Sequence, residues 1–142
     1  MHALSRKTLD ITDRGEVNRV VNAIHPDWII NTAAYTAVDK AESQRDKAFH
    51  VNADGVTNIA EIATKKKVKM VQVSTDYIFD GESPRPYKVN DTPKPINVYG
   101  ESKLAGEYQA TTIMGENLLI LRSAWIYSIK GPSFLTSMQR LL

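Results

Sequence analysis

Three short apolar runs recur along this chain, and their arrangement limits the possible folds more than any other feature of the sequence. The runs, each followed by small or polar residues, are 28–30 with 31–35, 68–73 with 74–77, and 118–121 with 123–125. Their length and β-branched content favour buried strands over helices. Segments with helical patterns separate them, and this alternation predicts an α/β fold, a doubly wound parallel sheet with right-handed crossovers.

The first helical segment carries a clear start signal. Asp13 is followed three residues later by Glu16, which is the spacing of a capping box. Apolar residues then recur at helical spacing, at Val17, Val20, Val21 and Ile24. The pattern predicts a helix that ends at residues 25–26, where proline follows histidine.

Three more segments have helical patterns. Residues 41–66 form one, with a possible break at residues 54–55, and residues 98–113 form another. A last amphipathic helix is marked by Phe134, Leu135, Met138 and Leu142. Four prolines between residues 80 and 97 predict a segment without regular structure. A connection of this length inside a compact domain is more often functional than idle.

Composition excludes several classes of protein. A length of 142 residues suits one domain. The absence of cysteine excludes disulfides and thiolate metal sites, and the three histidines are too scattered to indicate a metal site. A net charge of +2 gives no reason to expect nucleic acid or a membrane as partner. Because no apolar run approaches the roughly 18 residues of a membrane span, and the first residues do not read as a secretory signal, we expect a cytoplasmic protein.

Tyr99 and Lys103 form the first candidate for chemistry. They lie four residues apart in a predicted helix, so their side chains rise from the same face. A lysine ammonium beside a phenol favours the phenolate and lowers the tyrosine pKa, which makes the tyrosine a usable acid or base. Such spacing also arises by chance, and an exposed pair without function is the alternative interpretation.

A pair of hydroxyls, Ser74 and Thr75, stands at the predicted end of a strand upstream of Tyr99. Around these residues the sequence resembles the extended short-chain dehydrogenase/reductases, and within them the dTDP-4-dehydrorhamnose reductases. The resemblance runs from residue 9 to about residue 142, and the blocks that carry it, in order, are 9–13, 31–42, 51–53, 74–81, 97–107 and 121–127. Each block is suggestive, and six in the same order are highly specific.

The resemblance implies roles for three catalytic residues. Tyr99 would donate a proton to the 4-keto oxygen of a sugar as hydride arrives from a nicotinamide. Lys103 would lower the Tyr99 pKa and hold the nicotinamide ribose. Thr75 would donate a hydrogen bond to the keto oxygen. A tuned acid, an electrostatic helper and an oxyanion donor around one reacting carbon are physically consistent roles.

The resemblance also implies binding residues. For the cofactor, NADPH or NADH, they are Asp10, Ile11, Ala33, Ala34 and Tyr35, together with Tyr99 and Lys103. For the dTDP-deoxysugar they are Thr75, Asp76 and Trp125. From the residues alone, Asp10 is more simply a turn residue before the first helix, and Trp125 is equally a core residue.

One part of the family's pattern is missing from this sequence. The family opens with a strand, a glycine-rich turn and a helix that hold the cofactor pyrophosphate, whereas the seven glycines here are scattered. The C-terminal part of the family's chain is also missing. We therefore expect residues 1–142 to be a partial NAD(P)-binding Rossmann-like domain, truncated at its first βαβ unit and inactive alone. Uncovered sheet edges and helix faces would make it a homo-oligomer.

The implied function is NAD(P)H-dependent reduction of dTDP-4-dehydro-L-rhamnose to dTDP-L-rhamnose. One alternative is a non-catalytic, NADP-binding regulatory subunit of the same fold. Another is a sister reductase or epimerase that acts on a different nucleotide sugar. The presence of Thr75, Tyr99 and Lys103 together favours an enzyme, because a binding module needs no proton donor.

Overall fold

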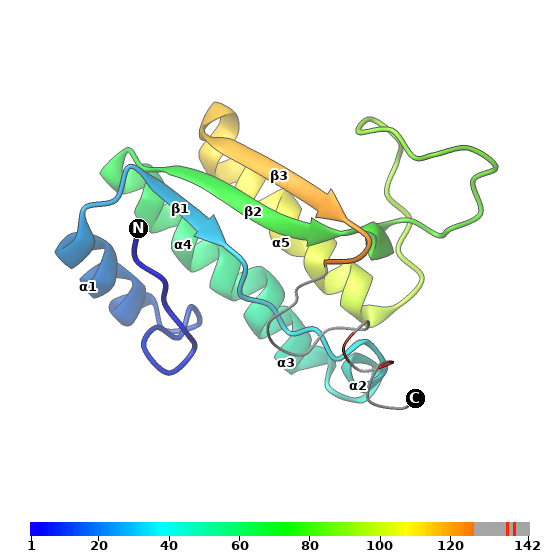
Figure 1. Ribbon diagram of the computed structural model, residues 1–142, viewed down its shortest axis with the longest axis horizontal. Coiled ribbons are helices and arrows are strands. Elements are labelled where there is room, and N and C mark those ends of the chain that lie inside the picture. The colour runs from blue at the N-terminus through cyan, green and yellow to red at the C-terminus, as the bar shows by residue number, and fades with distance from the viewer. Residues whose placement is uncertain (127–135, 137, 139–142) are drawn as a thin grey trace.

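The computed structural model describes residues 1–126, 136 and 138, and in this part of the chain three parallel strands form one sheet (Figure 1). In sheet order, the strands are β1 (Trp28–Asn31), β2 (Lys69–Thr75) and β3 (Leu118–Ser123). The helices are α1 (Arg14–Ile24), α2 (Val38–Ser43), α3 (Arg45–Phe49), the π-helix η1 (His50–Asp54), α4 (Gly55–Lys66), α5 (Val98–Met114) and the 3-10 turns η2 (Asp76–Ile78) and η3 (Gly115–Asn117). The predicted parallel α/β fold is confirmed.

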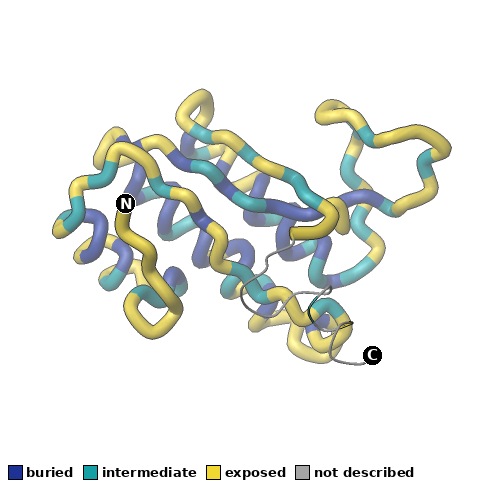
Figure 2. Tube along the Cα trace, in the orientation of Figure 1, coloured by how far each residue is buried: buried dark blue, intermediate teal, exposed yellow. Residues whose placement is uncertain are grey.

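Helices α1, α4 and α5 cover one face of the sheet and bury the main core (Figures 1 and 2). Met70, at the centre of that face, has no exposed surface. The buried residues of the core cluster are Ile11, Val17, Val21, Val56, Ile59, Ala60, Ile62, Ala63, Val68, Met70, Ala110 and Met114. The helix predicted around residues 134–142 lies outside the described residues, apart from Thr136 and Met138. Within the described chain, no helix is both long and apolar enough to cross a membrane.

The opposite face of the sheet carries apolar side chains that nothing in the described chain covers. Ile30, Val71 and Leu119 are partners in the strand register, so they form one row across this face. Ile30 is 64% exposed and Leu119 is 51% exposed. The prediction of buried strands at residues 28–30 and 118–121 is therefore wrong for this face in the described residues, because the helices lie on the other side of the sheet only.

Helix α1 begins with half of the predicted capping box. The Asp13 carboxylate accepts a hydrogen bond from the Glu16 backbone N–H at 2.9 Å. The Glu16 carboxylate does not return to Asp13; it accepts from the backbone N–H of Asp10 at 2.7 Å. The helix ends as predicted, since His25 adopts a left-handed conformation (φ 48°) and Pro26 cannot continue the hydrogen bonding.

The helical region before β2 is divided differently from the prediction. Its first helix begins at Val38, and the chain breaks at Gln44, between α2 and α3. No break occurs at residues 54–55, because η1 runs directly into α4. The π-helical turn widens the helix locally at the point where Asn52 is buried.

Candidate functional site

The carboxyl end of β2 places Thr75 beside the start of α5. Thr75 is buried, and its hydroxyl donates a hydrogen bond to Asp76 Oδ1 at 3.1 Å while it accepts one from the Tyr77 backbone N–H at 3.2 Å. Together these bonds fix the turn η2 directly after the strand. In parallel sheets this edge is where ligands bind.

Three contacts bring the first turn of α5 to the same edge. The Asn97 side chain caps the helix by accepting from the Gly100 N–H at 2.7 Å, and the Glu42 carboxylate accepts from the Val98 N–H at 2.9 Å. At Gly100 a Cβ would collide with the Tyr77 carbonyl oxygen, so glycine allows the close approach of α5 to η2. The Tyr99 ring consequently lies edge-on to Tyr77, with centroids 5.6 Å apart.

The half-buried position of Tyr99 affects its acidity. Burial raises the pKa of Tyr99, the Thr75 hydroxyl opposes this rise, and the negative charge of Asp76 adds to it. The spacing of Tyr99 and Lys103 predicts a lowered Tyr99 pKa, and this part of the prediction is wrong for the structure as it stands. Tyr99 therefore keeps its proton at neutral pH, as a proton donor must, but a raised pKa makes it a weaker acid than the predicted lowered pKa would.

Lys103 lies one turn further along α5 and is 5% exposed. Its ammonium donates a hydrogen bond to the Val73 carbonyl oxygen at 2.8 Å. Burial lowers the pKa of Lys103 to about 8, and the nearby charge of Glu107 opposes the change. The alternative of an exposed surface pair is excluded, because the lysine is buried against β2.

Asn52 joins the start of α5 to the segment after β1, and sequence reasoning gave this residue no role. It is 1% exposed, and its side chain accepts from the Tyr35 N–H at 2.8 Å and donates to the Tyr35 carbonyl oxygen at 3.1 Å. It also donates to the Ser102 hydroxyl, which in turn donates to the carbonyl oxygen of Tyr99. Residues 51–53 are one of the blocks that carry the family resemblance, and this block is the signal from which a role for Asn52 could have been predicted.

The strand-end residues Ala33, Ala34 and Tyr35 therefore lie beside the Tyr99 helix. The Ala33 N–H donates to the Asn31 side chain at 3.1 Å, which turns the chain at the end of β1. Tyr35 and Tyr99 both pack against the small cluster formed by Ala41, Ala48 and Val98.

Asp10 and Ile11 form a separate group before α1. The Asp10 carboxylate accepts from the backbone N–H and hydroxyl of Thr12, and these bonds lower the Asp10 pKa. This geometry is that of a turn residue, as the alternative interpretation had it. Ile11 is 7% exposed and belongs to the main core, where it packs beneath Gly55.

The two expected substrate residues other than Thr75 lie at the surface near the strand ends. Asp76 is exposed in η2 beside Thr75. Trp125 follows β3 and is 55% exposed, so it is not a core residue of the described chain. Both positions leave the side chains accessible to a ligand.

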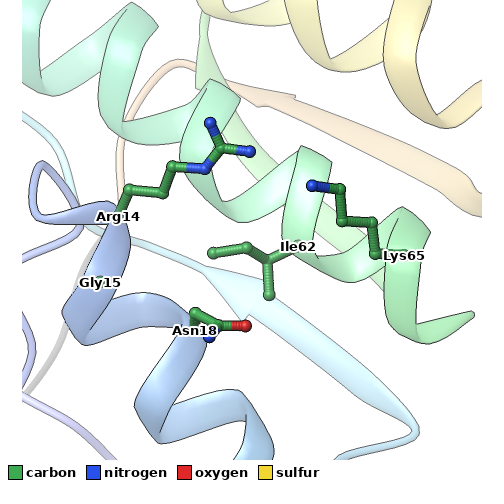
Figure 3. A pocket seen from close by; sticks show the side chains of 5 residues that line it. All are labelled: Arg14, Gly15, Asn18, Ile62 and Lys65. Atoms are coloured by element: carbon green, nitrogen blue, oxygen red, sulfur yellow. The ribbon is translucent and has the colours of Figure 1, made fainter.

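A hollow of about 340 Å³ elsewhere on the molecule includes none of these residues. It lies between α1 and α4 and is lined by Arg14, Gly15, Asn18, Ile62 and Lys65 (Figure 3). Arg14 is already paired with Glu61 of α4 at 2.6 Å. No cluster of possible metal ligands occurs among the described residues.

Comparisons with known proteins agree with the resemblance. A family model described as "RmlD substrate binding domain" matches residues 1–142. The chain is 46% identical over 138 residues to the dTDP-4-dehydrorhamnose reductase of Sinorhizobium fredii, a match that covers 97% of this chain and 46% of the relative. It is 40% identical to the dTDP-4-keto-6-deoxy-D-glucose reductase of Streptomyces niveus, a match that covers 98% of this chain and 48% of the relative.

A solved structure shares the fold closely. The dTDP-4-dehydrorhamnose reductase of Bacillus anthracis in complex with NADP matches with a TM-score of 0.94 and 41% identity, covering 99% of this chain and 50% of that one. The present chain thus spans about half the length of the relatives it matches.

Proposed function

The chain belongs to the RmlD substrate binding domain family, and from that membership we propose that the whole protein reduces the 4-keto group of a dTDP-4-keto-6-deoxysugar, dTDP-4-dehydro-L-rhamnose, to the alcohol. Residues 1–142 contribute part of an NAD(P)-binding Rossmann-like domain together with the proton donor. The observation that carries the proposal is the meeting of Thr75, Tyr99 and buried Lys103 at the carboxyl end of β2.

The proposed roles are those that the family resemblance implies, and the positions of the side chains support them. The Tyr99 hydroxyl, protonated at neutral pH, donates its proton to the sugar keto oxygen. The Thr75 hydroxyl lies near that of Tyr99, and by turning away from Asp76 Oδ1, to which it donates in this structure, it donates a hydrogen bond to the same oxygen. The Lys103 ammonium, which donates to the Val73 carbonyl oxygen in this structure, would hold the nicotinamide ribose. Asp76 and Trp125, at the exposed strand ends, contact the nucleotide sugar.

The residues present fit a nicotinamide cofactor. Ala33 and Ala34 offer small side chains at the end of β1, and Tyr35 lies beside α5 through its bonds to Asn52. Within the described chain, the Ser74 hydroxyl is a buried polar atom without a hydrogen-bond partner, at the end of β2. When bound, NADPH or NADH supplies the hydride that the carbonyl carbon accepts. The NADP complex of the Bacillus anthracis relative supports NADPH.

The name of the Streptomyces niveus relative supports a second candidate substrate. That relative is called a dTDP-4-keto-6-deoxy-D-glucose reductase, and it is 40% identical to this chain. The two substrates differ in the configuration of the sugar ring and share the 4-keto group, so the roles of Tyr99, Lys103 and Thr75 are the same for both.

The test measures NADPH oxidation with each dTDP-4-keto sugar, comparing the 142-residue chain with the protein extended to the full length of its relatives. We expect the longer protein to turn over one of the sugars and the 142-residue chain to be inactive. A longer protein that binds NADPH but reduces neither sugar would contradict the reductase and favour a regulatory subunit.

A further inference from the structure

A buried ion pair joins the Tyr99 helix to the third strand. Glu107 of α5 is 3% exposed, and its carboxylate accepts hydrogen bonds from Arg122 Nη2 at 2.7 Å and Arg122 Nε at 3.2 Å. The Arg122 side chain of β3 is 26% exposed. A planar guanidinium that bonds a carboxylate at two nitrogens fixes the orientation of both groups.

Arg122 also holds the proline-rich segment that follows the Thr75 strand. Its Nη1 donates to the Val89 carbonyl oxygen at 3.3 Å, and its guanidinium lies 5.6 Å from the centre of the Phe79 ring. Phe79 in turn stacks on Tyr87 with ring centres 4.2 Å apart. The segment has no helix or strand, as predicted, and projects from the body of the molecule (Figure 1). Arg122 is thus a point where this segment is attached to the sheet.

Glu107 lies one helical turn after Lys103, on the same buried face of α5. The charge of the Glu107 carboxylate acts on the Lys103 ammonium from within α5, and Arg122 of β3 is the ion-pair partner of that carboxylate. From η2, Asp76 and Tyr77 act on Tyr99 rather than on Lys103. The contact of Lys103 with β2 is to a neutral carbonyl oxygen. In the part of the chain that the structure describes, the charge that acts on the Lys103 ammonium is therefore that of Glu107, which Arg122 holds in place.

We propose that Glu107 and Arg122 are positioning residues for the reductase site, a proposal that rests on the proposed function. The pair sets the balance of charge felt by the Lys103 ammonium, and through Arg122 it holds residues 79–89 beside the strand that carries Thr75. Neither residue touches the reacting atoms; both act through Lys103 and through the segment.

The direct test is the titration of Lys103 by NMR in the full-length protein, with ¹³C-labelled lysine and the signal assigned by its loss in Lys103→Arg. Glu107→Gln removes the negative charge, so the Lys103 pKa falls below its value of about 8 by roughly half a unit or more. Arg122→Gln removes the positive charge, so the Lys103 pKa rises. A purely structural pair would not produce shifts of opposite sign.

The matched control is Glu61→Gln, which removes a carboxylate from the surface ion pair with Arg14. It leaves the Lys103 titration unchanged. Thermal unfolding establishes which variants fold. Either Glu107→Gln or Arg122→Gln is sufficient by itself, because each is expected to shift the Lys103 pKa in its own direction. A Lys103 titration that matches the wild type in the folded site variants overturns it.

Turnover provides the second readout. Arg122→Gln releases residues 79–89, so the KM for the sugar nucleotide rises severalfold while the KM for NADPH stays within about twofold. Equal changes in both constants overturn the anchoring role. If the wild-type protein reduces no dTDP-4-keto sugar, the proposed function fails, whereas the NMR titration still decides whether the pair controls Lys103.

Discussion

Burial shifts the pKa values of Tyr99 and Lys103 in opposite directions, because it penalises the charged form of each side chain. The pKa of Tyr99 rises and that of Lys103 falls to about 8. The spacing of the two residues correctly predicts a shared helix face. It could not predict the sign of the tyrosine shift, which depends on how far each side chain is buried and on the Val73 carbonyl that holds the ammonium.

Replacing the proposed acid tests its role directly. Tyr99→Phe in the full-length protein removes the proton and little binding surface. We expect kcat to fall by about 10²–10⁴-fold, while the affinity for NADPH changes little. Steady-state kinetics and a fluorescence titration with NADPH measure the two effects, and an unchanged kcat would contradict the assignment of Tyr99 as the acid.

A buried lysine should also lower stability at neutral pH. The folded pKa of Lys103, about 8, lies below its ordinary value of 10.5, so near neutral pH folding desolvates a charge. Lys103→Met should raise the free energy of unfolding by about 1–3 kcal/mol at pH 7, although it removes activity. Urea denaturation measures this difference.

The pH dependence of that difference has a definite sign. Between about pH 8 and 10.5 the unfolded chain keeps a proton on Lys103 that the folded chain has lost, so wild-type stability rises with pH relative to Lys103→Met. The advantage of the methionine variant should therefore shrink towards about pH 10. An advantage that is constant with pH would mean that Lys103 is not desolvated in the folded protein.

Among the elements, α5 positions the site most directly, and its close approach to η2 depends on Gly100. Gly100→Ala places a methyl group against the Tyr77 carbonyl oxygen. We expect a loss of about 1–3 kcal/mol in the free energy of unfolding and a fall in kcat as Tyr99 moves away from Thr75. Gly15→Ala in α1 is the control, since the added Cβ would lie 3.2 Å from its nearest neighbour, a side-chain oxygen of Asp13. Urea denaturation compares the two variants.

Elements with strong local signals were predicted well. The predicted helix at residues 98–113 and the observed α5, Val98–Met114, begin at the same residue, because Asn97 caps the start. Their ends differ by one residue. The break expected at residues 54–55 was wrong, since Gly55 serves close packing against Ile11 rather than a turn. The π-helix was not predicted, because the bonds that hold Asn52 come from segments distant in sequence.

At the scale of the whole molecule, the uncovered sheet face is the dominant feature. Its exposed apolar side chains include Ile30, Leu119 and Leu121. Contiguous exposed apolar surface drives association, so we expect the 142-residue chain to form oligomers whose mass rises with concentration. Light scattering of the wild type and of Leu119→Lys measures this; the variant should shift towards the monomer. A wild type that remains a monomer would contradict the prediction.

The π-helix has a consequence for how this gene can change over time. Residues 45–66 form one unbroken helical run, in which Ala48 packs against one buried cluster and Val56 and Ile59 pack against another. Deleting one residue from residues 50–54 would rotate everything after it by about 100° and turn Val56 and Ile59 away from the sheet. We therefore expect descendants of this gene to accept substitutions at the exposed positions of the run more readily than any change in its length.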